Sequence, residues 1–126
     1  MVYINLNNLK LKTFTEQDAE DYCLLNNLIP ENIKILDLNF NKLKKISGIK
    51  LFKNLEILIV GYNKITNLSF LNNLNKLIYI DIDGLKLKSD QIKYINSCKK
   101  LKEIHTIKAF ENRSVLNQLN KNIKIY

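Results

Sequence analysis

The aspartates are the residues whose types and spacing best suit chemistry. Asp81 and Asp83 lie two positions apart in "IYIDIDGL", so on a strand both side chains point to the same face of the sheet. Asp37 holds the equivalent place in an earlier stretch of similar pattern, "IKILDLN". Carboxylates gathered on one face suit a divalent cation or a basic group of a partner. A third alternative is that they are only solvated, and the sequence leaves the three open.

A thiol and an imidazole are the other reactive groups that the chain offers. The cysteines are Cys23 and Cys98, and the single histidine is His105. We expect Cys98 on the buried side of a helix and His105 on a strand, so a catalytic pair is not expected. Two buried apolar thiols are the preferred interpretation, with a disulfide or a metal pair as the alternatives.

Motifs for enzymatic chemistry are absent from the sequence. One histidine cannot build a histidine-rich metal cluster. The three glycines form no phosphate-binding loop, dinucleotide fingerprint or nucleophile elbow. We therefore predict a non-catalytic protein with no cofactor and no metal site.

Length and composition favour one soluble domain. The chain has 126 residues, of which 46% are hydrophobic, and a formal net charge of +8, which together suit a single folded domain with a basic surface. No apolar run approaches the ~18 residues of a membrane span. The start, "MVYINLNNLK", does not resemble a signal peptide. We expect an intracellular, cytoplasmic protein with no membrane partner, with the nucleus left open as a location.

An internal repeat organises the chain. Residues 33–54 and 55–76 are both 22 residues long, with apolar residues at unit positions 1, 4, 6, 11, 14, 17 and 20. A third unit covers 77–100, a degenerate unit and a last strand cover 101–126, and 1–32 holds a first strand and a helix. Positions 3 to 7 alternate as in a strand, and the later spacing of three favours a helical or 3₁₀ return. Stacked units bury one continuous core, so we predict a single domain over 1–126.

Three segments are predicted to be helical. The first covers about 13–27, with Thr13 and Glu16 as a capping box. The second covers 90–98, capped by the residue at 89 or 90, and the third covers 114–120. The predicted buried stripe of the first helix consists of Phe14, Tyr22, Leu25 and Leu28.

The repeat resembles the leucine-rich repeat family. The matching segments are "LEILIVGYNKI", "IKILDLNFNKL" and, less fully, "LIYIDIDGLKL". The resemblance is to the short 22-residue class, of the type found in the regulatory subunit of protein phosphatase one and in an axonemal dynein light chain. It implies an α/β solenoid with a curved parallel sheet of about five or six strands on the concave face and short helices or 3₁₀ turns on the convex face. It also implies an interaction scaffold, and regulation of an enzyme such as a phosphatase is one alternative for its role.

The concave face is the predicted binding surface for a helix or loop of a partner protein. Residues at unit positions 3, 5, 7 and 8 should point outward from such a sheet. Apolar and aromatic side chains gathered there, with acid beside them, favour a protein interaction. A helix or tail of the same chain covering this face is the alternative. The predicted partner-binding residues are Tyr3, Ile35, Asp37, Phe40, Ile57, Ile59, Tyr62, Tyr79, Asp81, Asp83, Glu103 and His105.

A row of lysines forms a rival surface. Lys10, Lys42, Lys64 and Lys86 all occupy unit position 10 and should line one edge of the stack. Such a row suits a nucleic acid or another polyanion, although it lacks the aromatic interleaving that base stacking uses. A solvated edge that keeps the protein soluble is the plainer alternative.

Two further expectations concern the turns and the edges of the sheet. Asn41 and Asn63 share unit position 9 and should turn inward to satisfy backbone groups at the bend. Strands at both ends of the stack would leave edges open, so edge-to-edge association with another copy or a partner is an alternative.

Overall fold

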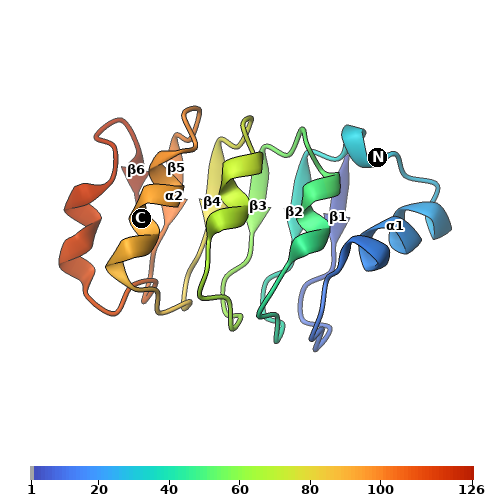
Figure 1. Cartoon of the computed structure of the whole chain (residues 1–126), viewed down its shortest axis with the longest axis horizontal. Coiled ribbons are helices and arrows are strands. Elements are labelled where there is room, and N and C mark those ends of the chain that lie inside the picture. Colours follow the sequence, from blue (N-terminus) through green and yellow to red (C-terminus); the bar gives the residue numbers. More distant parts are fainter. Residues whose placement is uncertain (1) are drawn as a thin grey trace.

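The computed structural model describes residues 2–126, which form one sheet of six parallel strands. The strands lie side by side in chain order from β1 to β6, and short helices separate them (Figure 1). The chain is therefore α/β with an open, all-parallel sheet, as predicted. The strands are β1 (Tyr3–Asn5), β2 (Ile35–Asp37), β3 (Ile57–Ile59), β4 (Tyr79–Asp81), β5 (Glu103–His105) and β6 (Lys124–Ile125).

The pairing register follows the sequence repeat. Leu36 is paired with Leu58 and Leu58 with Ile80, so residues at the same unit position stand next to each other. The same register continues to Ile4 on one side and Ile104 on the other. Each unit position therefore becomes a row of side chains that crosses the whole sheet.

Short helices carry the chain back from the end of one strand to the start of the next. The returns after β2 and β3 are 3₁₀ helices, as the spacing of three predicts. The predicted helix over 90–98 is shorter, and the predicted helix over 114–120 is a 3₁₀ helix instead. The bounds are η1 (Pro30–Asn32), η2 (Ser47–Leu51), η3 (Ser69–Asn73), η4 (Ser89–Gln91), α2 (Ile92–Asn96) and η5 (Arg113–Gln118).

The N-cap of the first helix, α1 (Glu16–Leu25), is Thr15, two residues later than the predicted cap Thr13. Thr15 accepts a hydrogen bond from the backbone N–H of Asp18, and the Asp18 carboxylate accepts one from the backbone N–H of Thr15. The predicted Thr13–Glu16 box is wrong, because the chain offers a second match to the same motif two residues on. The buried side of the helix is Ala19 and Cys23, whereas the predicted Leu25 is 81% exposed.

One continuous core fills the space between the sheet and the helices. Strand residues such as Leu36, Leu58 and Ile80 are fully buried and belong to the same cluster as the apolar residues of the returns. The N-terminal segment joins this core through Phe14, whose ring stacks on Phe52 with centroids 6.3 Å apart. None of the helices within residues 2–126 is long and apolar enough to cross a membrane.

The two repeated asparagines hold neighbouring turns together. Asn41 Oδ1 accepts the backbone N–H groups of Leu9 and Leu11, and its Nδ2 donates to the carbonyl oxygens of Leu6 and Leu38. Asn63 does the same one unit later, since its Oδ1 accepts the N–H of residue 43 and its Nδ2 donates to the carbonyl of residue 38. The prediction that both side chains turn inward is confirmed.

Candidate functional site

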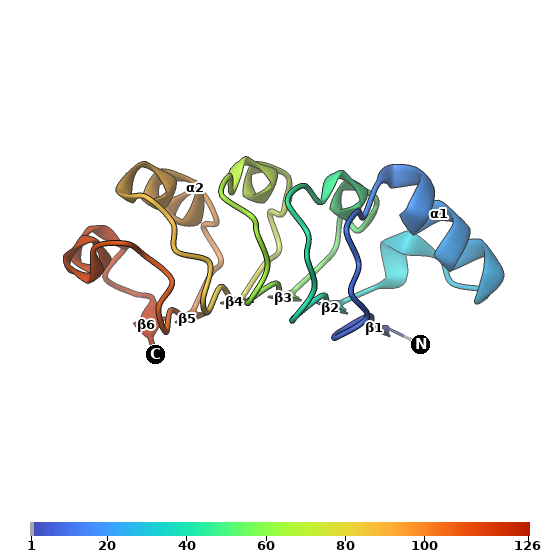
Figure 2. The ribbon, with the colours of Figure 1, turned by 90° about the horizontal axis from the view of Figure 1, so that it is seen from below.

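One face of the sheet carries no helix. Figure 2 shows the helices on one side of the row of strands, and the row is bowed so that the opposite face is concave. We call this uncovered side the concave face. No helix or tail within residues 2–126 covers it. The alternative that a helix or tail of the same chain covers this face is therefore wrong for the described part of the chain.

The apolar floor of the concave face is a row across the middle of the sheet. Ile35 is paired with Ile57, and Ile57 with Tyr79. These three and Ile59 are half-buried rather than fully exposed, because each side chain in a row is flanked by its neighbours about 4.8 Å away. The prediction that they face outward from the sheet is correct, but their accessible area is smaller than alternation alone suggests.

An aromatic pair, Phe40 and Tyr62, stands at the rim of this floor. The two rings stack with centroids 4.7 Å apart and planes inclined by 4°. Phe40 is 53% exposed and Tyr62 is 41% exposed. The pair therefore presents a rigid apolar surface to solvent beside the concave face.

The backbone under the aromatic pair is strained. Phe40 has φ 55° and Tyr62 has φ 52°, a left-handed conformation that is unusual for bulky side chains. The next position of the same row is Gly84, at φ 73°, where an added Cβ would stand 2.6 Å from the Tyr62 ring. A glycine at 84 is thus required for the ring of Tyr62 to lie across the row.

Two predicted site carboxylates are buried by contacts within the chain. Asp37 is 8% exposed, accepts the backbone N–H of Asn39 and accepts the side-chain amide of Asn7. Asp83 is 9% exposed and its Oδ1 accepts the backbone N–H of Ile107 at 2.8 Å. The prediction that Asp37 and Asp83 are accessible to a partner is therefore wrong. Both side chains are buried because they accept backbone N–H groups that fix the turns.

Asp81, Asp83 and His105 converge near β4 and β5. One ligand-type atom from each lies within 4.8 Å of the others. Burial raises the pKa of Asp81, and the nearby negative charge of Asp83 adds to the effect, while the N–H of residue 83 and the charge of His105 act in the opposite direction. The His105 ring lies between two tyrosine rings, 5.5 Å from that of Tyr79 and 5.1 Å from that of Tyr126.

An oxygen-rich spot lies next to this cluster. A Cβ at Gly61 would come within 2.8 Å of Asn39 Oδ1 and 3.2 Å of Asp81 Oδ1. The Asn39 oxygen is buried and receives no hydrogen bond within residues 2–126. Asn39 and Gly61 are not among the predicted partner-binding residues. The feature of the sequence that could have indicated them is that they share a unit position with Asp83.

The predicted concave-face carboxylates have no cationic partner within the described residues. The ion pairs formed within residues 2–126 join Lys34 to Glu56 at 3.7 Å and Lys50 to Glu16 at 3.9 Å, and neither involves these carboxylates. We call Asp37, Asp81, Asp83 and Glu103 the acidic group. Three of its four members, Asp37, Asp81 and Asp83, lie on or just after β2 and β4, whereas Glu103 is paired across the strands with Lys124.

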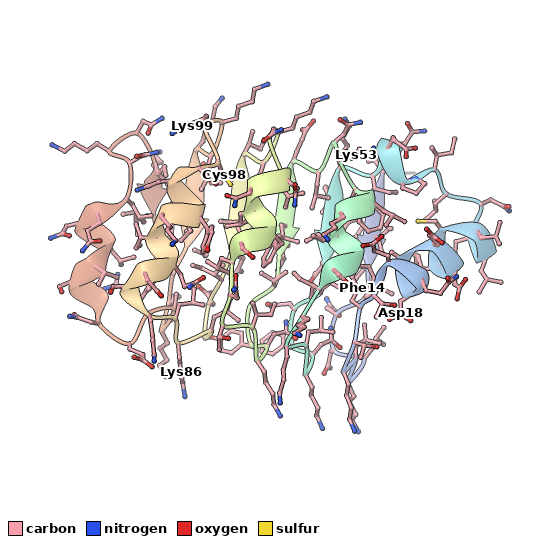
Figure 3. All side chains as sticks on the ribbon, viewed as in Figure 1. Phe14, Asp18, Lys53, Lys86, Cys98 and Lys99 are labelled. Atoms are coloured by element: carbon pink, nitrogen blue, oxygen red, sulfur yellow. The ribbon has the colours of Figure 1, made fainter. Side chains whose placement is uncertain are left out.

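The predicted lysine row forms no ion pair with the acidic group within residues 2–126, although Lys124 of β6 is the cross-strand neighbour of Glu103. The predicted row, Lys10, Lys42, Lys64 and Lys86, is exposed throughout. Figure 3 shows Lys86 at one long edge of the molecule and Lys53 and Lys99 at the opposite edge. Positive charge is therefore spread over both edges rather than confined to the predicted row.

The cysteines lie in the core as free thiols, as predicted. Burial raises the pKa of Cys98 to about 11, and burial, with a smaller effect of Glu31, also raises the pKa of Cys23. Because the thiolate is the nucleophilic form, both thiols are protonated and unreactive at neutral pH.

Comparison with known proteins adds no relative. No family model matches the chain, and no curated protein matches it.

Proposed function

We propose that the chain is a leucine-rich repeat solenoid that binds a helix or loop of a partner protein on its concave face. The repeat of 22 residues and the in-register parallel sheet support the family assignment. The uncovered concave face supports the choice of surface. Binding of this kind needs no catalytic group, which agrees with the protonated, buried thiols.

The observation that carries the proposal is the aromatic pair. Two bulky side chains in a left-handed backbone cost about 1–2 kcal/mol each relative to an unstrained conformation. The same left-handed conformation recurs at the equivalent position of the other units, at Asn8, Gly84 and Lys108, so it belongs to the repeat and fixes where the two rings lie. Exposed aromatic rings held rigidly are also typical anchors of protein interfaces. Phe40 and Tyr62 are therefore the central contacts of the proposed interface.

The dimensions of the face fit a single segment of a partner. Six strands spaced about 4.8 Å apart span roughly 25 Å, which accommodates one helix or one loop. The half-buried row of Ile35, Ile57 and Tyr79 forms the floor against which an apolar side of that segment packs.

The experiment compares partner capture by matched variants. Tyr62→Gly combined with Ile59→Ala removes the anchor and part of the floor, while glycine at 62 suits the left-handed backbone. Leu24→Ala, at a site that is 79% exposed on α1, is the control for loss of an exposed apolar side chain. We expect the double variant to lose partners captured from cell extract that both the wild type and the control retain.

Equal capture by the double variant would assign the interface to another surface. Circular dichroism and urea unfolding of both variants establish that loss of binding does not reflect loss of folding. The same capture at low and high salt addresses polyanion binding by the lysine row. Neutralising Lys42 and Lys64 with glutamine should leave capture unchanged if the concave face is responsible.

A further inference from the structure

We propose that the concave face selects a partner segment that carries an arginine, whose guanidinium binds to Asp81 and Asp83 beside the aromatic pair. This inference rests on the proposed function and names the chemistry of the partner. It is carried by charge segregation, by the arrangement of free carboxylate oxygens and by the neighbouring aromatic rings.

Charge segregation is the first argument. The chain has 20 basic and 12 acidic residues, yet no lysine or arginine within residues 2–126 forms an ion pair with Asp81 or Asp83. The half-buried carboxylate of Asp81 and the largely buried carboxylate of Asp83 are costly without a compensating charge. A cation supplied by another molecule would provide that compensation.

Free oxygens with fixed positions are the second argument. Asp81 Oδ1 accepts the backbone N–H of Asp83 at 2.9 Å, and Asp83 Oδ1 accepts the N–H of Ile107 at 2.8 Å. These bonds orient both carboxylates and leave Oδ2 of each without a donor from residues 2–126. Both carboxylates are therefore fixed in position, and each keeps one oxygen that the fold does not use, although Asp83 is only 9% exposed.

The spacing suits a guanidinium. Ligand atoms of the two aspartates and His105 lie within 4.8 Å of one another. Charge-assisted hydrogen bonds from a cationic nitrogen to an oxygen are about 2.7–2.9 Å long, so one planar guanidinium with several N–H groups reaches both carboxylates. Arginine suits two adjacent carboxylates better than lysine does, because its donors form a fixed fork.

The aromatic pair supplies the third argument. The ring of Tyr62 packs over Gly84, which directly follows Asp83 in the chain, and the N–H of Tyr62 donates to the Asp83 carbonyl oxygen at 2.7 Å. The exposed rings and the acidic cluster are therefore adjacent parts of one surface. The aliphatic stem of an arginine packs on such rings while its charged end reaches the acid.

A partner protein fits this site better than a second copy of the chain. Its own basic residues are lysines except for Arg113, and a net charge of +8 makes two copies repel each other. A partner segment of lower net charge that carries an arginine avoids this repulsion.

The test uses amphipathic peptides with one central position varied. The probes are acetylated, amidated 15-residue peptides that are identical except for arginine, lysine or citrulline at the centre, citrulline being the uncharged counterpart of arginine. Fluorescence anisotropy gives the affinity, and two-dimensional amide NMR locates the contact. We expect the arginine peptide to bind about tenfold more tightly than the citrulline peptide and to shift the signals of Asp83, Gly84 and Ile107.

Matched variants locate the preference. Asp81→Asn with Asp83→Asn keeps the side-chain oxygens that accept the backbone N–H groups but removes both charges, and it should abolish the tenfold difference. Lys64→Gln with Lys86→Gln should retain it. Equal affinity for the arginine and citrulline peptides, or no NMR shift at millimolar peptide, would overturn the inference.

Two further outcomes also overturn it. Shifts of the same amide signals on addition of Zn²⁺ or Ca²⁺ alone at micromolar concentration would reassign the cluster to a metal. Concentration-dependent association in sedimentation that disappears in the double aspartate variant would reassign it to a second copy. A last outcome separates this inference from the proposed function. If the arginine, lysine and citrulline peptides bind with equal affinity and the Tyr62→Gly, Ile59→Ala variant no longer binds them, the proposed function stands and only the arginine preference fails.

Discussion

The rings of Phe40 and Tyr62, 22 residues apart in the sequence, stack with their planes inclined by only 4°. Their positions are equivalent in successive units, so the in-register sheet brings them together. Both have a left-handed backbone. A single surface feature thus combines repeat register, local strain and exposed aromatic area.

Replacing Tyr62 should separate backbone strain from side-chain packing. Both Tyr62→Ala and Tyr62→Gly lose the stack, but only alanine must still adopt φ 52° with a Cβ. We expect Tyr62→Gly to have a free energy of unfolding higher than that of Tyr62→Ala by about 1 kcal/mol. Urea denaturation of both variants measures the difference. A more stable alanine variant would contradict the left-handed backbone.

Replacing Asp81 should stabilise the protein at neutral pH. The pKa of Asp81 is raised above the ordinary value of 3.8, chiefly by burial, so the folded state holds the proton more tightly than the unfolded state. Stability from this group is therefore present at low pH and is lost as pH rises through the raised pKa. Asp81→Asn keeps an acceptor for the N–H of Asp83 and removes the charge.

We expect the gain in unfolding free energy of Asp81→Asn to be near zero below pH 3.8 and to grow towards neutral pH, reaching no more than about 1 kcal/mol. Thermal unfolding at several pH values checks this trend. Glu20→Gln, on the exposed side of α1, is the control and should change less. A loss of stability at pH 7 in Asp81→Asn would show that the carboxylate charge stabilises the fold.

Removing the side chain of Asn41 should weaken the stack. The substitution Asn41→Ala leaves the N–H groups of Leu9 and Leu11 and the carbonyl of Leu6 without their side-chain partner. Unsatisfied buried polar groups are costly, so we expect a loss of about 2–4 kcal/mol in unfolding free energy. Asn72→Ala, exposed on η3, is the control. A loss below 1 kcal/mol would mean that water replaces these bonds.

The thiols should report on unfolding. Cys98 is buried, and its pKa is raised to about 11, so native protein should react with DTNB far more slowly than urea-unfolded protein. Cys23 is also buried and should behave likewise, although α1 lies at one end of the sheet. The rate in native buffer, with and without urea, provides the measurement. Rapid reaction of Cys98 in the native state would contradict its burial.

The sequence by itself determined the repeat, the parallel sheet, the inward asparagines and the faces of most side chains. This was possible because strand alternation and the spacing of apolar residues in the returns are local patterns. A local motif was not sufficient to predict the first helix cap, because two overlapping segments match the capping-box pattern. Thr13 and Thr15 both precede an acidic residue by three positions, and the structure has the cap at Thr15, next to Phe14, whose carbonyl accepts the N–H of Gly48.

Tertiary structure decided the properties of the candidate site. Whether Ile57 is exposed or half-buried, and whether Asp83 is free or bound to the N–H of Ile107, depends on neighbours that lie more than twenty residues away in the sequence. The packing of the Tyr62 ring over Gly84 and the lack of an ion pair at Asp81 and Asp83 within residues 2–126 have the same origin. Register across the sheet, rather than any single segment, determines which side chains meet.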